Sequence, residues 1–291
     1  MPVPFEPPIE TASSLQDAFA RLAASTQDDP LTPIAGGTDV MVRITGEIGE
    51  PPSRLLDLWR LDELRGIVGD GGTITLGALT TYTEIRRSAP CREHLPALVE
   101  AAATIGAAQI QNRGTLGGNI ANASPAGDTL PVLLALDAEI VVGGPRGERT
   151  IPANEFWVAY RRTALAPDEL ILRIRIPVGG SREARFRKIG TRRAQAISKV
   201  VMAVAWREAP GTAEWRDVRV ALGSVADRPI RAAAAEAALE GAPPSPEAAD
   251  HAAEALAGEI HPIDDVRSTA EYRRVVAARA LHRIVRDAGG W

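Results

Sequence analysis

Two glycine pairs with hydroxyl and amide neighbours are the residues best suited to bind a ligand. The first lies in Ala35-Gly36-Gly37-Thr38-Asp39, and the second lies in Gly114-Thr115-Leu116-Gly117-Gly118-Asn119. Glycine accepts a positive φ and lets a ligand come close to the backbone, so successive N–H groups can converge on an anion. Threonine and asparagine side chains add further donors, which suits a diphosphate. Taken singly, each motif is more often a plain turn.

Composition narrows the classes of function. The chain of 291 residues has a formal net charge of -4 and a pI near 5.7, which argues against a nucleic-acid-binding surface. The arginine pairs Arg161-Arg162, Arg192-Arg193 and Arg273-Arg274 are interpreted as solvated faces or interface pairs. Neither a G-x-G-x-x-G fingerprint nor a Walker lysine motif occurs, so another phosphate-binding architecture is required.

Cysteine and histidine content excludes most metal chemistry. Cys91 is the only cysteine, so the chain cannot hold an iron–sulfur cluster with its own thiolates or form an internal disulfide. The four histidines show no metal-ligand spacing, and we expect no metal site. The first six residues do not resemble a signal peptide, and no stretch is apolar and long enough to cross a bilayer. We therefore expect a cytoplasmic protein with no membrane segment.

Hydrophobic patterning predicts an α+β protein in which short strands alternate with helices. Ser14 and Asp17 resemble a capping pair for the first helix, and Ser268 and Glu271 resemble one for the last. The 179–181 segment is the best candidate linker. Helices are predicted at 14–24, 96–103, 129–136, 231–239, 246–256 and 268–287. Strands are predicted at 31–34, 54–58, 73–76, 170–176, 199–206 and 215–222. A hairpin is predicted to pair 139–142 with 150–151 across 143–147, and 40–44 is either helical or extended.

The second glycine motif sits inside a longer and more specific stretch. Residues 110–128, IQNRGTLGGNIANASPAGD, resemble the signature of the FAD subunits of the xanthine dehydrogenase family. Pro33–Asp39 resembles that family's first diphosphate loop, and Leu76–Thr81 resembles the strand and turn that follow it. Arg267–Arg273 is similar to the start of the last helix of the family. The resemblance spans nearly the full chain with its parts in the expected order.

This resemblance implies a two-lobed FAD-binding fold of the vanillyl-alcohol-oxidase type, followed by a C-terminal α+β domain. The lobes would cover 1–58 and 59–177, and the last domain would cover 178–291. The implied FAD-binding residues are Ala35, Gly36, Gly37, Thr38, Asp39, Ile105, Thr115, Leu116, Gly117, Gly118, Asn119, Asp128, Ile171 and Lys188.

Some implied positions carry alternatives. Asp128 would accept hydrogen bonds from flavin N–H groups or sugar hydroxyls, although it could also cap the helix at 129–136. Lys188 would lie near the isoalloxazine ring, where a cation stabilises anionic reduced flavin. Ile171 could contact the cofactor or simply pack in the core, and Ile105 offers aliphatic packing where some relatives have an aromatic ring.

The family resemblance also implies a role in a larger assembly. A molybdenum-cofactor large subunit would hydroxylate the substrate, and a [2Fe-2S] small subunit would pass single electrons to FAD on this chain. FAD would then deliver them to NAD+, oxygen or another acceptor. The expected assembly is a dimer of heterotrimers. Two alternatives stay open: a self-sufficient FAD-dependent alcohol or sugar oxidase, and a nucleotide-binding scaffold without redox activity.

Overall fold

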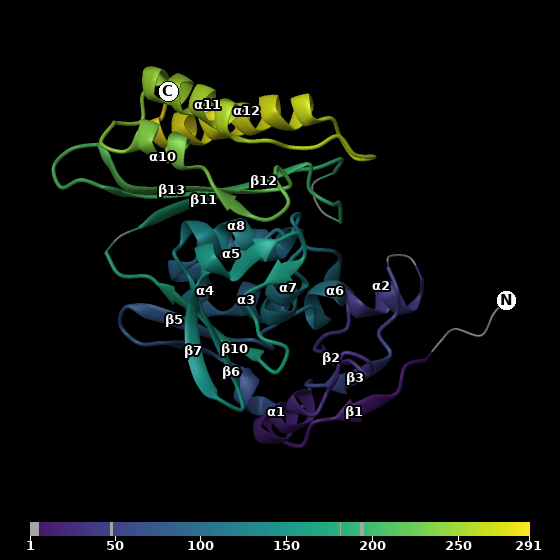
Figure 1. The fold of residues 1–291 in the computed structure, drawn as a ribbon. Coiled ribbons are helices and arrows are strands. Elements are labelled where there is room, and N and C mark those ends of the chain that lie inside the picture. The colour runs from purple at the N-terminus through teal and green to yellow at the C-terminus, as the bar shows by residue number, and fades with distance from the viewer. Residues whose placement is uncertain (1–5, 47–48, 181, 193–194) are drawn as a thin grey trace.

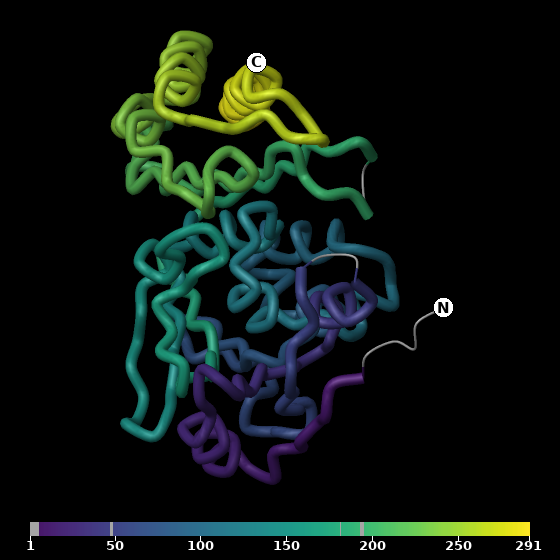
Figure 2. The backbone as a smooth tube through the Cα atoms, turned by 45° about the vertical axis from the view of Figure 1, so that its right-hand side comes forward, coloured from purple at the N-terminus to yellow at the C-terminus, as the bar shows by residue number. Residues whose placement is uncertain are grey.

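The chain folds into stacked layers of helices and sheets (Figure 1). The computed structural model describes residues 6–46, 49–180, 182–192 and 195–291. Three C-terminal helices cover one antiparallel sheet, a layer of shorter helices separates it from a second antiparallel sheet, and a small parallel sheet lies beyond (Figures 1 and 2). Within the described residues no helix combines the length and hydropathy that a bilayer span requires. The predicted α+β class is confirmed.

The N-terminal lobe is a parallel three-stranded sheet with strand order β1-β3-β2. Ser14 caps its first helix by accepting a hydrogen bond from the Asp17 N–H at 3.1 Å, as the sequence predicted. Phe19 and Leu22 on that helix pack into the core of the lobe. The elements are β1 (Ile9–Thr11), α1 (Leu15–Ala23), β2 (Leu31–Ile34), α2 (Val40–Ile44) and β3 (Arg54–Asp57).

The second lobe is built on a five-stranded antiparallel sheet with strand order β4-β5-β10-β6-β7. Ile74, Ile140 and Ile174 lie on the face that packs against the helix layer. Its strands are β4 (Ile67–Gly69), β5 (Thr73–Gly77), β6 (Glu139–Gly144), β7 (Gly147–Pro152) and β10 (Leu170–Pro177). Its helical segments are η1 (Asp62–Leu64), α3 (Tyr82–Arg87), α4 (Ala89–His94), α5 (Pro96–Thr104), α6 (Ala108–Arg113), α7 (Leu116–Asn122), α8 (Leu130–Ala135) and α9 (Ala153–Phe156), followed by the hairpin β8 (Trp157–Ala159) and β9 (Arg162–Thr163).

The C-terminal domain packs a four-stranded antiparallel sheet between two layers of helices. The Val200–Trp206 run is apolar throughout because alternate residues face opposite helix layers and both are buried. Trp206 and Trp215 stack with ring centroids 4.1 Å apart. The elements are β11 (Glu183–Ile189), β12 (Val200–Glu208), β13 (Trp215–Gly223), β14 (Ile230–Arg231), α10 (Ala233–Leu239), α11 (Pro246–Glu259) and α12 (Ala270–Gly289).

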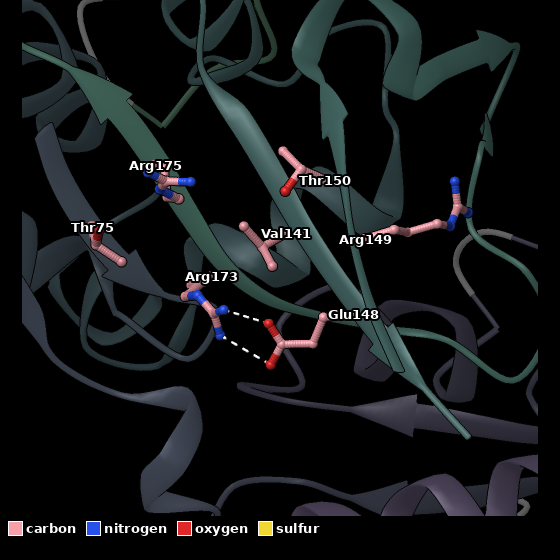
Figure 3. Close-up of a pocket in the computed structure, with 7 residues that line it drawn as sticks. All are labelled: Thr75, Val141, Glu148, Arg149, Thr150, Arg173 and Arg175. Carbon is pink, nitrogen blue, oxygen red and sulfur yellow. Dashed lines mark hydrogen bonds and ion pairs between the residues drawn. The ribbon is translucent and has the colours of Figure 1, made fainter. Parts of the chain in front are cut away.

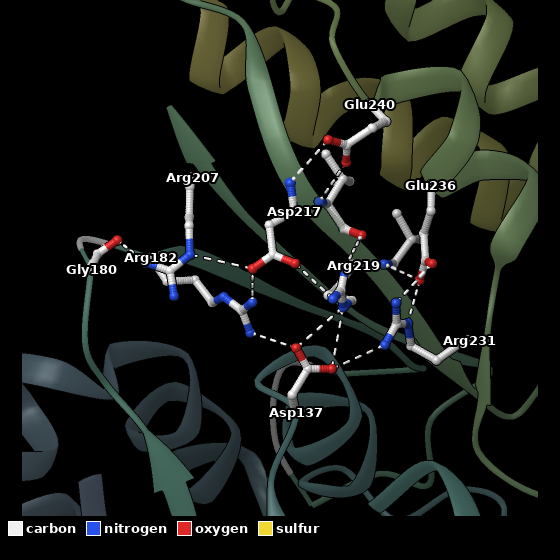
Figure 4. Close-up of polar contacts among 11 residues, drawn as sticks. Asp137, Gly180, Arg182, Arg207, Asp217, Arg219, Arg231, Glu236 and Glu240 are labelled. Carbon is white, nitrogen blue, oxygen red and sulfur yellow. Dashed lines mark hydrogen bonds and ion pairs between the residues drawn. The ribbon is translucent and has the colours of Figure 1, made fainter. Parts of the chain in front are cut away.

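One carboxylate links the C-terminal domain to the helix layer (Figure 4). Asp137 follows α8 in a left-handed conformation with φ 50 and forms ion pairs with Arg182 at 2.8 Å, Arg219 at 3.2 Å and Arg231 at 3.2 Å. Arg182 also pairs with Asp217 of β13, and its side chain is only 8% exposed. This cluster connects the end of α8 to three segments of the C-terminal domain.

Several local predictions need correction. Thr269 caps α12 by accepting from the Tyr272 N–H, whereas the Ser268 N–H donates to Asp265 in the preceding turn. Leu281, Ile284 and Val285 form a buried apolar face on α12, as its hydrophobic pattern predicts, whereas Tyr272 is 43% exposed. Arg273 is buried and pairs with Asp265, so its interpretation as part of a solvated face was wrong.

Two predicted element boundaries also differ from those in the structure. The hairpin continues to Gly144 paired with Gly147, so its loop has two residues rather than five. Arg231 belongs to β14, and the helix that follows begins at Ala233. Ser181 of the predicted linker lies outside the described residues.

Candidate functional site

The first glycine motif follows β2 and comes directly against the second. Gly37 has φ +78, a conformation that favours glycine. A Cβ on Gly36 would lie 1.7 Å from the Arg113 carbonyl oxygen, so the two backbones touch at this point. Motifs that are far apart in the sequence therefore meet in space, and only glycine fits between them.

The second motif is a helix start, which differs from the predicted loop. Thr115 caps α7 by accepting from the Gly118 N–H at 3.0 Å. The Leu116 N–H donates to the Thr80 carbonyl, and the Gly117 N–H donates to the Ala78 carbonyl, both at 2.9 Å. These three N–H groups already have protein acceptors, so the expectation that they converge on an anion was wrong.

Gly117 has a packing role. A Cβ there would lie 2.7 Å from Ala78, so glycine lets α7 approach the residue that follows β5. The Ala78 N–H in turn donates to the Leu172 carbonyl of β10 at 2.9 Å. Ile171, one residue earlier on that strand, is buried in the core beside a β-bulge. Packing in the core is thus its observed environment.

Asp128 and Lys188 form a buried ion pair across the two domains. Lys188 projects from β11, and its Nζ donates to Asp128 Oδ2 and to the Thr104 carbonyl at 3.2 Å. The Lys188 side chain is only 4% exposed, and the Asp128 side chain is only 8% exposed. Burial raises the pKa of Asp128 to about 6, against the opposing effect of the Lys188 charge. Ile105, half-buried, follows Thr104 and therefore lies beside this pair.

The second oxygen of Asp128 has no hydrogen-bond partner among the residues that the structure describes. Oδ1 is buried, and no described residue donates to it. The alternative reading of Asp128 as a helix cap is wrong, because Thr129 occupies the cap position of α8. A buried carboxylate oxygen without a donor costs about 1–3 kcal/mol unless a ligand supplies one. This atom is therefore a position where a bound molecule can donate a hydrogen bond.

The C-terminal domain holds the turn that carries Asp128. The Ser224 N–H donates to the Pro125 carbonyl at 2.8 Å, and Ser198 Oγ lies 2.9 Å from Ser224 Oγ. Arg273 donates to the Ser224 carbonyl at 2.8 Å. Nearby, Thr129 donates to Asn119 Oδ1 at 2.6 Å, which orients that amide. The site depends on both domains.

Further residues at the site were not assigned a role from the sequence. Asn122 Nδ2 donates to Asp39 Oδ1 at 2.8 Å, and Arg161 donates to Asn122 Oδ1 at 3.1 Å. The Arg113 guanidinium stacks 3.8 Å from the ring centroid of Trp59. Arg113 also lines a hollow with Gly36, Gly37, Thr38 and α2 residues. Asn122 lies within the recognised signature, which was the available signal for it.

A second hollow, on the outer face of the five-stranded sheet, is not part of this site. Arg173 pairs there with Glu148 (Figure 3). Arg149 pairs with Glu169 at 2.7 Å. Arg175 pairs with Glu139 at 3.4 Å. Because each guanidinium has a carboxylate partner, these ion pairs connect neighbouring segments of the lobe and leave no excess cation for a ligand.

Comparisons with known proteins show the family to which the chain belongs. The family described as the FAD binding domain in molybdopterin dehydrogenase matches residues 4–179, and the CO dehydrogenase flavoprotein C-terminal domain matches residues 185–288. The chain therefore belongs to the family of FAD-binding medium subunits of the carbon monoxide dehydrogenase and xanthine dehydrogenase type. It is a subunit of an oxidoreductase, and its cofactor is FAD.

Individual relatives agree over nearly the whole chain. The carbon monoxide dehydrogenase medium chain of Hydrogenophaga pseudoflava is 32% identical, with 94% of each chain covered. The nicotine 6-hydroxylase medium subunit of Paenarthrobacter nicotinovorans is 33% identical, with 97% of this chain and 98% of the relative covered. The solved structure of reconstituted CO dehydrogenase from Oligotropha carboxidovorans superposes with a TM-score of 0.92, at 29% identity and with 99% of both chains covered.

The residues at the site fit FAD. The unpaired Oδ1 of Asp128 can accept from a flavin N–H or a sugar hydroxyl, because both are donors that FAD carries. At the first motif, Gly37 adopts a positive φ, and the neighbouring hollow is lined by Gly36, Gly37 and Thr38. Bound FAD would supply two-electron and one-electron redox chemistry, and these residues would set its position and charge environment.

Proposed function

We propose that this chain takes electrons from a [2Fe-2S] partner subunit and passes them to NAD+, oxygen or another acceptor. A molybdenum-cofactor large subunit would oxidise the substrate of the complex. The observation that carries this proposal is the full-length similarity to medium subunits of enzymes such as carbon monoxide dehydrogenase. The single cysteine, Cys91, is buried, so the iron–sulfur relay has to come from another chain.

We also propose which residues hold the cofactor. Ala35–Asp39 and Thr115–Asn119 would bind the diphosphate, with Asp128 and Lys188 at the flavin and Ile105 and Ile171 beside it. The contact between Gly36 and Arg113 supports this placement, as does the free Oδ1 of Asp128. Because Leu116–Gly118 already use their N–H groups internally, this part of the motif would contribute the side-chain amide of Asn119.

The remaining proposals concern organisation. Domain boundaries at 58/59 and 177/178 are supported by the ends of β3 at Asp57 and of β10 at Pro177. The dimer of heterotrimers and a cytoplasmic location complete the proposal, and the latter is supported by the lone unpaired thiol of Cys91.

Flavin absorbance of the isolated chain and of the native complex tests this division of labour. Aldehydes, N-heterocycles, alcohols and sugars should leave the flavin of the isolated FAD-loaded chain oxidised. The complex purified from the source organism should contain molybdenum and iron, and its substrate should bleach the flavin. Reduction of the isolated chain by NADH would identify NAD+ as the acceptor. Bleaching of the isolated chain by an alcohol or sugar would instead show a self-sufficient oxidase.

A further inference from the structure

A short hairpin brings two large side chains next to the site. Strands β8 and β9 pair Trp157 with Thr163 and Ala159 with Arg162, which leaves Tyr160 and Arg161 as a two-residue turn. The base of the hairpin is fixed, because the Trp157 indole N–H donates to the Ile120 carbonyl of α7 at 3.1 Å. The tip is open to solvent, with Tyr160 61% exposed.

Arg161 connects this tip to both glycine motifs. Its guanidinium donates to Asn122 Oδ1 at 3.1 Å, and Asn122 Nδ2 donates to Asp39 Oδ1 at 2.8 Å. Asn122 ends the helix of the second motif, and Asp39 ends the first motif. One chain of side-chain hydrogen bonds therefore joins three segments that are far apart in the sequence.

The turn carries these side chains at a cost in backbone energy. Two-residue hairpin loops favour asparagine and glycine because their residues adopt positive φ. Arg161 has φ +51, a conformation that costs a non-glycine residue about 1–2 kcal/mol. Backbone strain of this kind is concentrated at functional sites, which favours a functional role for the Arg161 side chain.

The charge of Arg161 is also less compensated than that of Lys188. Lys188 contacts the Asp128 carboxylate directly. Arg161 is linked to Asp39 by hydrogen bonds through the Asn122 amide, and its charge lowers the pKa of Asp39 against the larger effect of burial. Within residues 6–46, 49–180, 182–192 and 195–291 no carboxylate forms a direct ion pair with it. A cation in this position suits a diphosphate, which carries two negative charges.

We propose that Arg161 is a cofactor-retention residue and that the β8–β9 hairpin is a strap across the FAD site. Arg161 fastens the strap to both glycine motifs through Asn122 and Asp39. FAD then leaves only after this hydrogen-bonded chain opens. The proposal rests on the assignment of the FAD diphosphate to the two motifs, and it concerns how tightly FAD is held rather than the electron transfer itself.

FAD dissociation from the full chain tests the strap, because Arg162 offers a matched control. Arg162 is the adjacent arginine on β9 and is exposed. Arg161→Met and Asn122→Ala should each raise the FAD dissociation rate and Kd about tenfold, the effect expected for a lost charge-assisted hydrogen bond. The double variant should be no weaker than either single one, because both break the same chain. Arg162→Met should match wild type.

Thermal unfolding of the FAD-free variants separates retention from folding. Arg161→Met should unfold at the wild-type temperature when FAD is absent. Equal dissociation rates for Arg161→Met and Arg162→Met would overturn the proposal, and so would additive effects of the Arg161 and Asn122 changes. A lowered unfolding temperature of the FAD-free Arg161→Met protein would also overturn it, since the residue would then be structural. If the wild-type chain itself fails to bind FAD, the assignment of the motifs fails first.

Discussion

The Asp128 carboxyl combines an ion pair, a buried oxygen without a donor among the described residues, and a raised pKa. Lys188 donates to one of its oxygens, and the other is buried with no donor in the described part of the chain. Burial raises the pKa of the carboxyl to about 6, so a proton can bind it close to physiological pH. The net charge of the Asp128–Lys188 pair in the FAD-free chain therefore depends on pH: the carboxylate balances the Lys188 charge above about pH 6 and no longer balances it below that pH.

Asp128→Asn should raise the midpoint potential of the bound flavin, because asparagine resembles the protonated acid and leaves the Lys188 charge uncompensated. The rise should be about 30 mV, a tenfold change in equilibrium constant for a two-electron couple. It should appear at a pH where wild-type Asp128 is ionised and vanish at low pH, where wild-type Asp128 also carries a proton. Because a donor from FAD to Oδ1 stabilises the carboxylate, this change should lie below the pKa of about 6 of the FAD-free chain. Spectroelectrochemical titration from pH 5 to 8 provides the measurement.

Lys188→Met is the matched variant with the opposite sign. Loss of the cation should lower the potential at pH 8, where Asp128 keeps its charge. Removing Lys188 also removes an effect that lowers the pKa of Asp128, so the variant takes up a proton at a higher pH than wild type. The difference in potential should therefore shrink where only the variant carries this proton, and return at lower pH, where wild-type Asp128 is protonated as well. Shifts of the same sign in both variants would show that the changes distort the site instead of altering its charge.

At the scale of elements, the site depends on how closely short segments approach one another. Gly36 lies against the end of α6, and Gly117 lies against the residue after β5. Both contacts are possible because glycine lacks a Cβ atom, so one added methyl group would disrupt either of them. The geometry of the first motif is thereby coupled to that of the second.

Gly36→Ala should separate the two motifs and release FAD. Its methyl group would meet the Arg113 carbonyl at 1.7 Å, so the backbone must move, at a cost of about 3 kcal/mol in the free energy of unfolding. Gly72→Ala is a suitable control, because a Cβ at Gly72 meets nothing within 4 Å. Flavin content and urea unfolding would measure both effects. Full flavin retention by Gly36→Ala would contradict the coupling of the motifs.

Helices and strands with a strong hydrophobic periodicity or a clear capping residue were predictable from the sequence. The strand at 31–34 and the helix that begins after Ser14 agree with the structure because an apolar pattern and a capping residue mark them. The sequence suggested backbone that binds an anion at the second motif, with a plain turn as the alternative, because glycine pairs usually mark turns. In the structure, Thr115 caps a helix there, and tertiary contacts with Ala78 and Thr80 stabilise it.

At the scale of the whole molecule, the site lies where both lobes and the C-terminal domain meet. Asp39 comes from the first lobe, Asp128 from the second and Lys188 from β11. The resemblance named these residues, but their mutual contacts, such as the Asp128–Lys188 pair, are set by packing between domains. Arg161 and Arg162 were interpreted together as a solvated face or an interface pair, and only the hairpin geometry distinguishes the two.

The most direct test of the account is a crystal structure of the FAD-loaded chain. We predict that the diphosphate lies against Gly36–Thr38 and the start of α7, and that a flavin N–H or sugar hydroxyl donates to Asp128 Oδ1. FAD bound elsewhere, or an Asp128 Oδ1 that remains without a donor when FAD is present, would contradict the assignment of the site.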